Sequence, residues 1–508
     1  MIRARALQSS RSVFVASLVS GVTFGLATPW SAAALAQPDP SASDAGPIAA
    51  PTAAAQPAVV PAPVPPPAPA DGGAPVATPP AGPAPATDSD AKPAEPFAFG
   101  DFSWQPGNYG SAEKPLAFGP FTGEVRMDTV YHYSFNHPVD DTISGSSEVF
   151  RHNEVQVTQI GFGGDFLYKN VQARLMTQFG MYAMTTPRND ASPGKGQWDL
   201  ANAYRYISEA YGGYHLNVMN GINIQAGIFM SYVGLWSYYN FDNWTYQPSY
   251  VSSNTPWFFD GIRVQIFPSD KLKIEPWLVN GWQSYGKFNQ APGVGVQIQW
   301  KPTESLAFVG NQYLGTDTLG VPDRMRIHTD DSVMFKYYQN KGGAFSKAAA
   351  SLTLDAGCEW GGEGSAHVDC MSQYFLGFMA YERMWFANDK LGLTIGGGAI
   401  TNPGRYLVLM PPINGATAFS GTPYFTEAPN DRYQAWDMQV AFDFMPKEFV
   451  TFRFEFNHRA ANVPYFTGPN GVTPPGGNQG SPGSMVNGWS PDLVKTEDRI
   501  TAAMMVRY

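Results

Sequence analysis

The chain has 508 residues but only 2 cysteines, and charged residues make up 15% of it, against roughly 25% in a typical globular domain. This scarcity of charge excludes a coiled coil or a charged helical bundle. No run of lysines and arginines is present and the net charge is −10, so we expect no nucleic-acid partner. After the first 40 positions no stretch approaches the ~20 consecutive apolar residues that a membrane-spanning helix needs, which excludes a helical membrane protein.

Motifs for catalysis and for metal binding are also missing. The 7 histidines are scattered, and no two of them have the spacing of metal ligands on one element. A lipid-cleaving enzyme would need a serine and a histidine oriented by a third group. His132, His215 and His458 lie near strand ends, but none accompanies a recognisable nucleophile motif. We therefore expect no catalytic residue, metal or cofactor, and keep a barrel enzyme acting on lipids only as the least favoured alternative.

The amino-terminal residues have the pattern of an export signal. Three arginines within the first 11 residues precede an apolar stretch at 13–27, and Ala34-Leu35-Ala36 supplies small residues two apart before Gln37. This arrangement is typical of a cleaved secretory signal. An uncleaved membrane anchor is less favoured because the run is short and Pro29 interrupts it. We predict a signal peptide at 1–36 and a mature chain that leaves the cytoplasm.

A spacer follows at 37–96. It is rich in proline and alanine, has no aromatic residue, and contains a single basic residue, Lys92. Such a sequence cannot bury a hydrophobic core, so we predict a disordered linker. In an extended polyproline conformation, at ~3.1 Å per residue, it would reach about 190 Å. A tether that crosses the periplasm towards peptidoglycan is therefore a second interpretation.

The composition changes after residue 96. Aromatic residues become frequent, and we assign 97–120 to a periplasmic lead-in. From 121 onwards apolar and polar residues alternate with period two, as expected for strands between two different solvents. In 449–457 one face carries Val450, Phe452, Phe454 and Phe456, and the other carries Thr451, Arg453, Glu455 and Asn457.

The connections between the predicted strands alternate in length. Short connections follow the even-numbered strands, such as 169–170 and 301–303, and longer ones follow most odd-numbered strands, such as 136–154 and 459–495. Short turns at one end and long loops at the other are typical of bacterial outer-membrane barrels. The predicted strands are 121–135, 155–168, 171–184, 204–217, 222–230, 257–267, 271–283, 294–300, 304–316, 331–339, 344–356, 371–386, 390–401, 431–444, 448–458 and 496–508.

These strands predict an all-β fold, namely a closed antiparallel transmembrane β-barrel of about sixteen strands over 121–508. In hydrocarbon every backbone group needs an internal partner, so the sheet must close. A sixteen-stranded barrel is too wide for side chains alone to fill, so we expect a water-filled lumen. The candidates for charged residues that line this pore are Glu124, Arg126, Asp128, Arg174, Arg263, Asp437, Asp443, Arg453, Glu455 and Arg499.

Two of the long loops carry further signals. The loop at 231–256 is rich in aromatic residues, which would be costly to expose at ~25 cal/mol per Å². It therefore either folds into the lumen as a constriction, which we favour, or lies over the rim. The candidate residues for the constriction are Tyr232, Trp236, Tyr239 and Trp244. Cys358 and Cys370 flank another loop, and two cysteines this close in an exported chain predict a disulfide.

Several segments resemble the OmpL-like family of β-barrel porins over roughly 100–508. The segments that carry the resemblance are Gln225-Ala226-Gly227-Ile228-Phe229, Thr255-Pro256-Trp257, Gly261-Ile262-Arg263, Leu391-Gly392-Leu393-Thr394-Ile395-Gly396-Gly397-Gly398 and Asn402-Pro403-Gly404-Arg405. The terminal Arg507-Tyr508 looks like the aromatic signal that such barrels present to the outer-membrane insertion machinery. The resemblance implies a location in the Gram-negative outer membrane and passive solute diffusion, and it transfers no substrate.

The sequence thus predicts an outer-membrane porin for small hydrophilic solutes, surrounded by outer-membrane lipid. The alternative is a structural anchor that the spacer tethers towards the cell wall. Sixteen-stranded porins commonly form trimers, and the sequence leaves a homo-oligomer open. The predicted outer loops carry more acidic than basic residues, so we expect a weak preference for cations.

Overall fold

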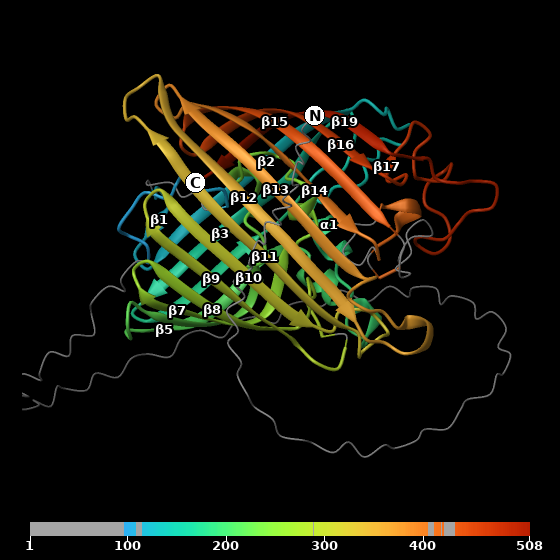
Figure 1. The fold of residues 1–508 in the computed structure, drawn as a ribbon, viewed down its shortest axis with the longest axis horizontal. Coiled ribbons are helices and arrows are strands. Elements are labelled where there is room, and N and C mark those ends of the chain that lie inside the picture. The colour runs from blue at the N-terminus through green and yellow to red at the C-terminus, as the bar shows by residue number, and fades with distance from the viewer. Residues whose placement is uncertain (1–95, 108–113, 288, 405–410, 418, 421–431) are drawn as a thin grey trace, which may run out of the picture. The chain divides into compact units, whose positions relative to one another are not determined.

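The computed structural model describes residues 96–107, 114–287, 289–404, 411–417, 419–420 and 432–508. The predicted signal peptide and all but the last residue of the predicted spacer lie outside these ranges. Sixteen strands of the described residues form a closed antiparallel β-barrel (Figure 1). Each barrel strand pairs with its neighbours along the chain, and the last, β19, pairs with the first, β2. The predicted fold class and strand number are confirmed.

The strands are generally longer than the mode of about 5–6 residues in globular proteins, as a tilted membrane-spanning strand requires. The barrel strands are β2 (Phe121–Ser134), β3 (Glu154–Tyr168), β4 (Val171–Thr177), β5 (Ile207–Leu216), β6 (Ile222–Met230), β7 (Phe258–Ser269), β8 (Leu272–Val279), β9 (Gly293–Thr303), β10 (Leu306–Gly315), β11 (Met325–Gln339), β12 (Phe345–Trp360), β13 (Tyr374–Phe386), β14 (Leu391–Asn402), β15 (Tyr433–Lys447), β16 (Val450–Ala461) and β19 (Thr496–Arg507).

The remaining elements are short and are not among the sixteen barrel strands, although the first of them pairs with the start of β2. They are β1 (Ala117–Phe118), β17 (Phe466–Thr467), β18 (Leu493–Val494), α1 (Tyr182–Arg188), α2 (Leu200–Tyr204), α3 (Tyr250–Ser253) and the 3₁₀ turns η1 (Ser192–Gly194), η2 (Asn240–Asp242), η3 (Gly364–Ala366) and η4 (Ile413–Gly415). Among the described residues, no helix has both the length and the apolar character needed to cross a membrane.

The barrel wall is polar inside and apolar outside, the reverse of a soluble protein. On β16, Arg453 and Glu455 are 3% and 0% exposed, whereas Phe452 and Phe454 are 42% and 54% exposed. Successive side chains of a strand point to opposite faces, so this alternation places the charged residues in the lumen and the phenyl rings on the outer surface. The face that hydrocarbon would contact is therefore apolar, and closure leaves no strand edge unpaired.

Two predicted strand boundaries differ from the structure by more than four residues. The third strand was expected to run to 184 but ends at Thr177, because Gly180 adopts a positive φ of 91° and the chain then enters α1. The strand expected at 331–339 begins earlier, at Met325. Its charged residues resemble a loop, but Arg326 and His328 point inwards and pair with β12, and the His328 ring lies 2.7 Å from a carboxylate oxygen of Asp355.

Candidate functional site in the barrel lumen

The aromatic loop between β6 and β7 is folded into the barrel. The backbone N–H groups of Tyr246 and Gln247 donate hydrogen bonds to the Glu455 carboxylate at 2.5 and 2.9 Å. The N–H of Tyr250 donates to Asp437 at 2.8 Å. Glu455 and Asp437 are pore-lining candidates on β16 and β15, so these bonds place the loop inside the lumen. Irregular buried backbone needs such partners, and the wall supplies them as carboxylates.

Arginines of the wall bind the carbonyl groups of the same loop. Arg453 donates to the carbonyl oxygen of Asn243 at 2.7 Å, and Arg383 donates to that of Trp244 at 3.2 Å. Both guanidinium groups also pair with the buried carboxylate of Asp443, each with a shortest distance of 2.7 Å. Carboxylates of the wall thus bind the N–H groups of the loop, and arginines of the wall bind its carbonyl groups.

A second group of predicted lining residues, on β2, contacts the η2 turn of the loop. Arg126 forms an ion pair with Glu124 and another with Asp242 at 3.2 Å. Its guanidinium lies 3.8 Å from the centre of the Tyr239 ring, a favourable cation–π geometry. Asp128 accepts a hydrogen bond from Asn240 at 3.1 Å. The predicted lining residues on this strand therefore also position the loop.

The other predicted lining residues are paired within the wall. Arg174 contacts Glu209 at 2.6 Å and Glu124 at 2.9 Å. Arg263 lies 4.4 Å from the centre of the Phe229 ring. Arg499 contacts Glu497 at 2.7 Å. Carboxylates therefore compensate Arg174 and Arg499 locally, whereas Arg263 lies over an aromatic ring and donates to the Gln225 amide oxygen at 2.7 Å.

The four aromatic candidates of the loop are all buried. Tyr232 donates to the Gln312 carbonyl at 3.0 Å, and Tyr239 donates to Glu209 at 2.8 Å. Trp236 packs against Tyr381 with ring centres 4.7 Å apart. Trp244 lies edge-on to Trp385 at 5.9 Å. The loop therefore spans from β5 and β10 to β13, across the lumen.

Residues 96–107 also enter the lumen, although they had been assigned to a periplasmic lead-in. Trp104 is 1% exposed and packs in one cluster with Trp236 and Trp244. Its indole N–H donates to the Glu304 carbonyl, and its own carbonyl accepts from the Trp244 indole, both at 3.1 Å. The N–H of Gly107 donates to the Asp242 carbonyl at 2.9 Å. This segment therefore supports the loop from the β9–β10 turn.

Lysines of the wall bind the aromatic rings of segment 96–107. The Lys301 ammonium lies 4.2 Å from the centre of the Phe102 ring and 4.7 Å from that of Phe97. Lys336 lies 5.7 Å from the Trp104 ring. The abrupt return of aromatic residues after the spacer was the available signal that this segment packs against the barrel.

The lumen, which was expected to be water-filled and narrowed by the loop at 231–256, also receives residues 96–107. Lining residues such as Glu455 and Arg499 are 0% exposed. Arg459 was assigned to a loop, yet it lies on β16, and its guanidinium is 4.0 Å from the Tyr250 ring centre. A sixteen-stranded barrel is too wide for side chains alone to fill, and the aromatic loop with residues 96–107 occupies part of the remaining space.

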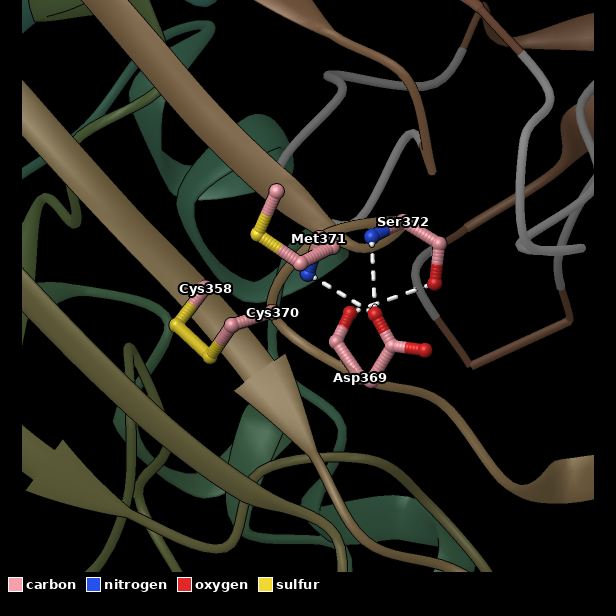
Figure 2. The surroundings of a disulfide bond; sticks show 5 residues. All are labelled: Cys358, Asp369, Cys370, Met371 and Ser372. Atoms are coloured by element: carbon pink, nitrogen blue, oxygen red, sulfur yellow. Dashed lines mark hydrogen bonds between the residues drawn. A yellow bond between two sulfur atoms is a disulfide. The ribbon is translucent and has the colours of Figure 1, made fainter.

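A disulfide links the end of β12 to the connection between β12 and β13. Cys358, at the end of β12, and Cys370 form a disulfide with their Cα atoms 5.0 Å apart. Figure 2 shows Asp369 accepting hydrogen bonds from the backbone N–H groups of Met371 and Ser372, at 2.8 and 3.1 Å. The terminal Tyr508 follows β19 and stacks on Phe449 at 5.0 Å.

The histidines considered for catalysis are not brought together. His132 contacts Thr501 at 2.9 Å, His215 contacts Asn223 at 2.7 Å, and His458 contacts Asp498 at 2.8 Å. Within the described ranges, no group of three or more His, Cys, Asp or Glu side chains could hold a metal ion.

One acidic group of the long β2–β3 loop reaches the lumen. Glu148, between β2 and β3, is buried, and burial raises the pKa of its carboxyl group. Its oxygens accept hydrogen bonds from Ser147 at 2.5 Å and from the Gln247 amide at 3.0 Å. The carboxyl group therefore joins the outer loop to the aromatic loop.

Comparisons with known proteins agree with this architecture. The family model described as "Putative beta-barrel porin-2, OmpL-like" matches residues 120–481. Among curated proteins, none matches the chain.

The solved structures that match the chain share little of its sequence. OmpT of Vibrio cholerae is 10% identical, with 77% of this chain and 99% of that chain covered and a TM-score of 0.41. An anion-selective porin from Comamonas acidovorans is 8% identical, with 76% and 99% covered and a TM-score of 0.45. OprB of Pseudomonas putida is 10% identical, with 76% and 94% covered and a TM-score of 0.42.

Proposed function

Because the chain belongs to the family "Putative beta-barrel porin-2, OmpL-like", we propose that it is an outer-membrane porin through which small hydrophilic solutes diffuse passively. The observation that carries this proposal is the sidedness of the closed barrel. Charged and amide side chains such as Arg453 and Glu455 face the lumen, and aromatic ones such as Phe452 face outwards. A closed wall of this kind suits lipid outside and a polar path inside.

In this proposal the aromatic loop and residues 96–107 set the width of the path. The aromatic loop is held to the wall by hydrogen bonds and ion pairs, and residues 96–107 are held by hydrogen bonds and cation–π contacts. The predicted lining charges have a double role, since they hold the loop and also give the path its polar surface. The resulting pore is narrower than a bare sixteen-stranded barrel.

The proposal includes export and insertion of the chain. The signal peptide at 1–36 is removed, the short turns face the periplasm, and the long loops with the disulfide face outwards. Tyr508 presents the terminal signal to the insertion machinery. Assembly as a homo-oligomer belongs to the same proposal.

A structural tether is the second candidate function. The observation that favours it is the attachment of the segment directly after the spacer, because the N–H of Phe97 donates to the Asp270 carbonyl at 3.2 Å. A spacer whose following segment is fixed at the turn between β7 and β8 can extend away from the barrel towards peptidoglycan. An enzyme acting on lipids has no comparable observation in its favour.

Electrical measurement tests the porin proposal. Purified protein added to a planar lipid bilayer should produce discrete conductance steps, and liposomes that contain it should swell in solutions of small sugars and amino acids. The control is the same preparation after heat denaturation. Folded protein that inserts into bilayers without conducting would contradict the porin and leave the tether.

A further inference from the structure

An open groove lies on the outer face of the barrel wall, over strands β11 to β14. Its volume is about 490 Å³. One row of cross-strand neighbours in its lining consists of Phe335, Ala350, Glu382 and Ile395, each directly opposite the next. Side chains of directly opposite residues share a face of the sheet. The short Ala350 side chain therefore leaves a recess between larger neighbours on the face that hydrocarbon would contact.

A carboxylate forms one side of this groove. Glu382 faces outwards on β13 and is exposed. The Tyr337 hydroxyl of β11 donates a hydrogen bond to it. Within the described part of the chain, the Glu382 side chain has no other hydrogen bond and no ion pair. A charge without a counter-charge is costly on an apolar face, so this carboxylate favours a cationic partner.

In the orientation proposed above, Glu382 lies near the periplasmic end of the wall. Strand β13 ends at Phe386, four positions beyond Glu382. A strand rises about 3.3 Å per residue and a barrel strand is tilted by about 40°, so this carboxylate lies about 10 Å from the strand end along the membrane normal. The exposed rings of Tyr337 and Tyr338 lie at the same end, as expected at the boundary between hydrocarbon and headgroups. The carboxylate is therefore within reach of headgroups of the periplasmic leaflet.

The charges of the wall favour a lipid over a second copy of the chain as the occupant. Among the strands that the structure describes, the lysines and arginines face the lumen, as Lys336 and Arg383 do, apart from Lys447 at the last position of β15. A second barrel would therefore bring no lysine or arginine from the middle of its wall. A phospholipid with an ammonium headgroup brings a cation together with acyl chains.

We propose that this groove is a binding site for a phospholipid with an ammonium headgroup, such as phosphatidylethanolamine. The ammonium group pairs with Glu382, which the Tyr337 hydroxyl positions. An acyl chain lies over Ala350 and Ala380, between the apolar side chains of the groove. The inference rests on the membrane orientation in the proposed function, which places the short turns in the periplasm.

Native mass spectrometry of the full mature protein in detergent tests the site. The protein is incubated with equal concentrations of phosphatidylethanolamine and phosphatidylglycerol that have the same acyl chains, because only the first carries a cation. Phosphatidylethanolamine should be retained over phosphatidylglycerol by about three- to tenfold. Equal retention of the two lipids, or a preference for phosphatidylglycerol, would overturn the proposal.

Three variants locate the binding. Glu382→Gln keeps an acceptor for the Tyr337 hydroxyl but removes the charge, so it should abolish the preference. Asp331→Asn is the matched control, because Asp331 is also exposed on the outer face of β11 but does not line the groove, and it should leave the preference unchanged. Ala350→Leu fills the recess and should lower the retention of both lipids. A preference that survives in Glu382→Gln would place the lipid elsewhere and overturn the site.

The same spectra give the oligomeric state of each variant. Loss of oligomers in Glu382→Gln, without a lipid preference in the unaltered protein, would assign the groove to a second copy and overturn the lipid site. Conductance of the same preparations separates this site from the porin. Conductance without a lipid preference would retain the porin and remove the site, and a lipid preference without conductance would retain the site and remove the passive pore.

Discussion

At the scale of single residues, many of the inward-facing charged side chains form ion pairs with one another and hydrogen bonds to the aromatic loop. Period-two alternation was enough to place Arg453 and Glu455 on the polar face of one strand. It could not show their partners, because these depend on the register between strands and on a loop about two hundred positions away in the sequence. Asp443, for example, lies directly opposite Arg453 on the neighbouring strand. Loop contacts of this range have no local sequence signal.

Glu455→Gln should loosen the aromatic loop. The two carboxylate oxygens of Glu455 each accept a backbone N–H, and a carboxamide places an N–H₂ group opposite one of these donors. The lost bond should cost about 1–3 kcal/mol. We expect larger and noisier single-channel currents than in the unaltered protein. Glu363→Gln, at an exposed loop carboxylate, is the control and should leave the currents unchanged.

The disulfide should stabilise the folded barrel without affecting the pore. Cys358 and Cys370 are separated by 12 positions, and closing a loop of this size constrains the unfolded chain by about 3 kcal/mol. The double variant Cys358→Ser with Cys370→Ser should unfold at a lower denaturant concentration and conduct normally. Mass spectrometry of non-reduced peptides should find the two residues linked in the unaltered protein. Two free thiols in the exported protein would contradict the bridge.

At the scale of elements, alternation and the rhythm of short and long connections predicted the strands well. They failed where polar residues were taken for a loop, as at 325–330, and where a glycine ended a strand, as at Gly180. They also missed the segment at 96–107, because its packing depends on the existence of a wide lumen. A short segment carries no local pattern that shows whether a lumen is present to receive it.

Removal of 97–107 should widen the pore. This segment buries Trp104 against the aromatic loop and binds lysines of the wall, so its loss leaves space and unsupported loop residues. We expect higher single-channel conductance. Deletion of the spacer at 38–95 is the matched control and should leave conductance unchanged, since it keeps 97–107 attached. Equal conductance in both deletions would show that the segment does not limit the pore.

Shortening the loop between β6 and β7 should have a larger effect. Replacing 233–254 by a short glycine-serine linker removes the peptide that crosses the lumen and frees Glu455, Asp437 and Arg453 to face water. Conductance should rise by more than in the 97–107 deletion, provided that circular dichroism still shows a β-barrel. An unchanged conductance with an intact barrel would mean that solutes take a path that avoids the loop.

At the scale of the whole molecule, ion selectivity should follow the loops more than the lumen. Arg174 and Arg499 of the lumen are paired with Glu209 and Glu497, so the fields of these pairs largely cancel. The outer loops carry more acidic than basic residues, and the chain has a net charge of −10. An acidic mouth raises the local cation concentration, but only within a Debye length of about 8 Å at physiological salt.

The reversal potential across a bilayer in a KCl gradient should therefore indicate a modest preference for K⁺. The preference should fade as the salt concentration rises, because screening removes the contribution of the mouth first. Replacing the exposed loop residues Asp199, Asp323 and Asp369 by asparagine should lower the preference at low salt and leave conductance at high salt unchanged. A clear preference for Cl⁻ at low salt would show instead that lumen arginines with incomplete pairing control the path. Arg126 and Arg459, each with a guanidinium nitrogen that lacks a partner in the described structure, would then be the first residues to substitute.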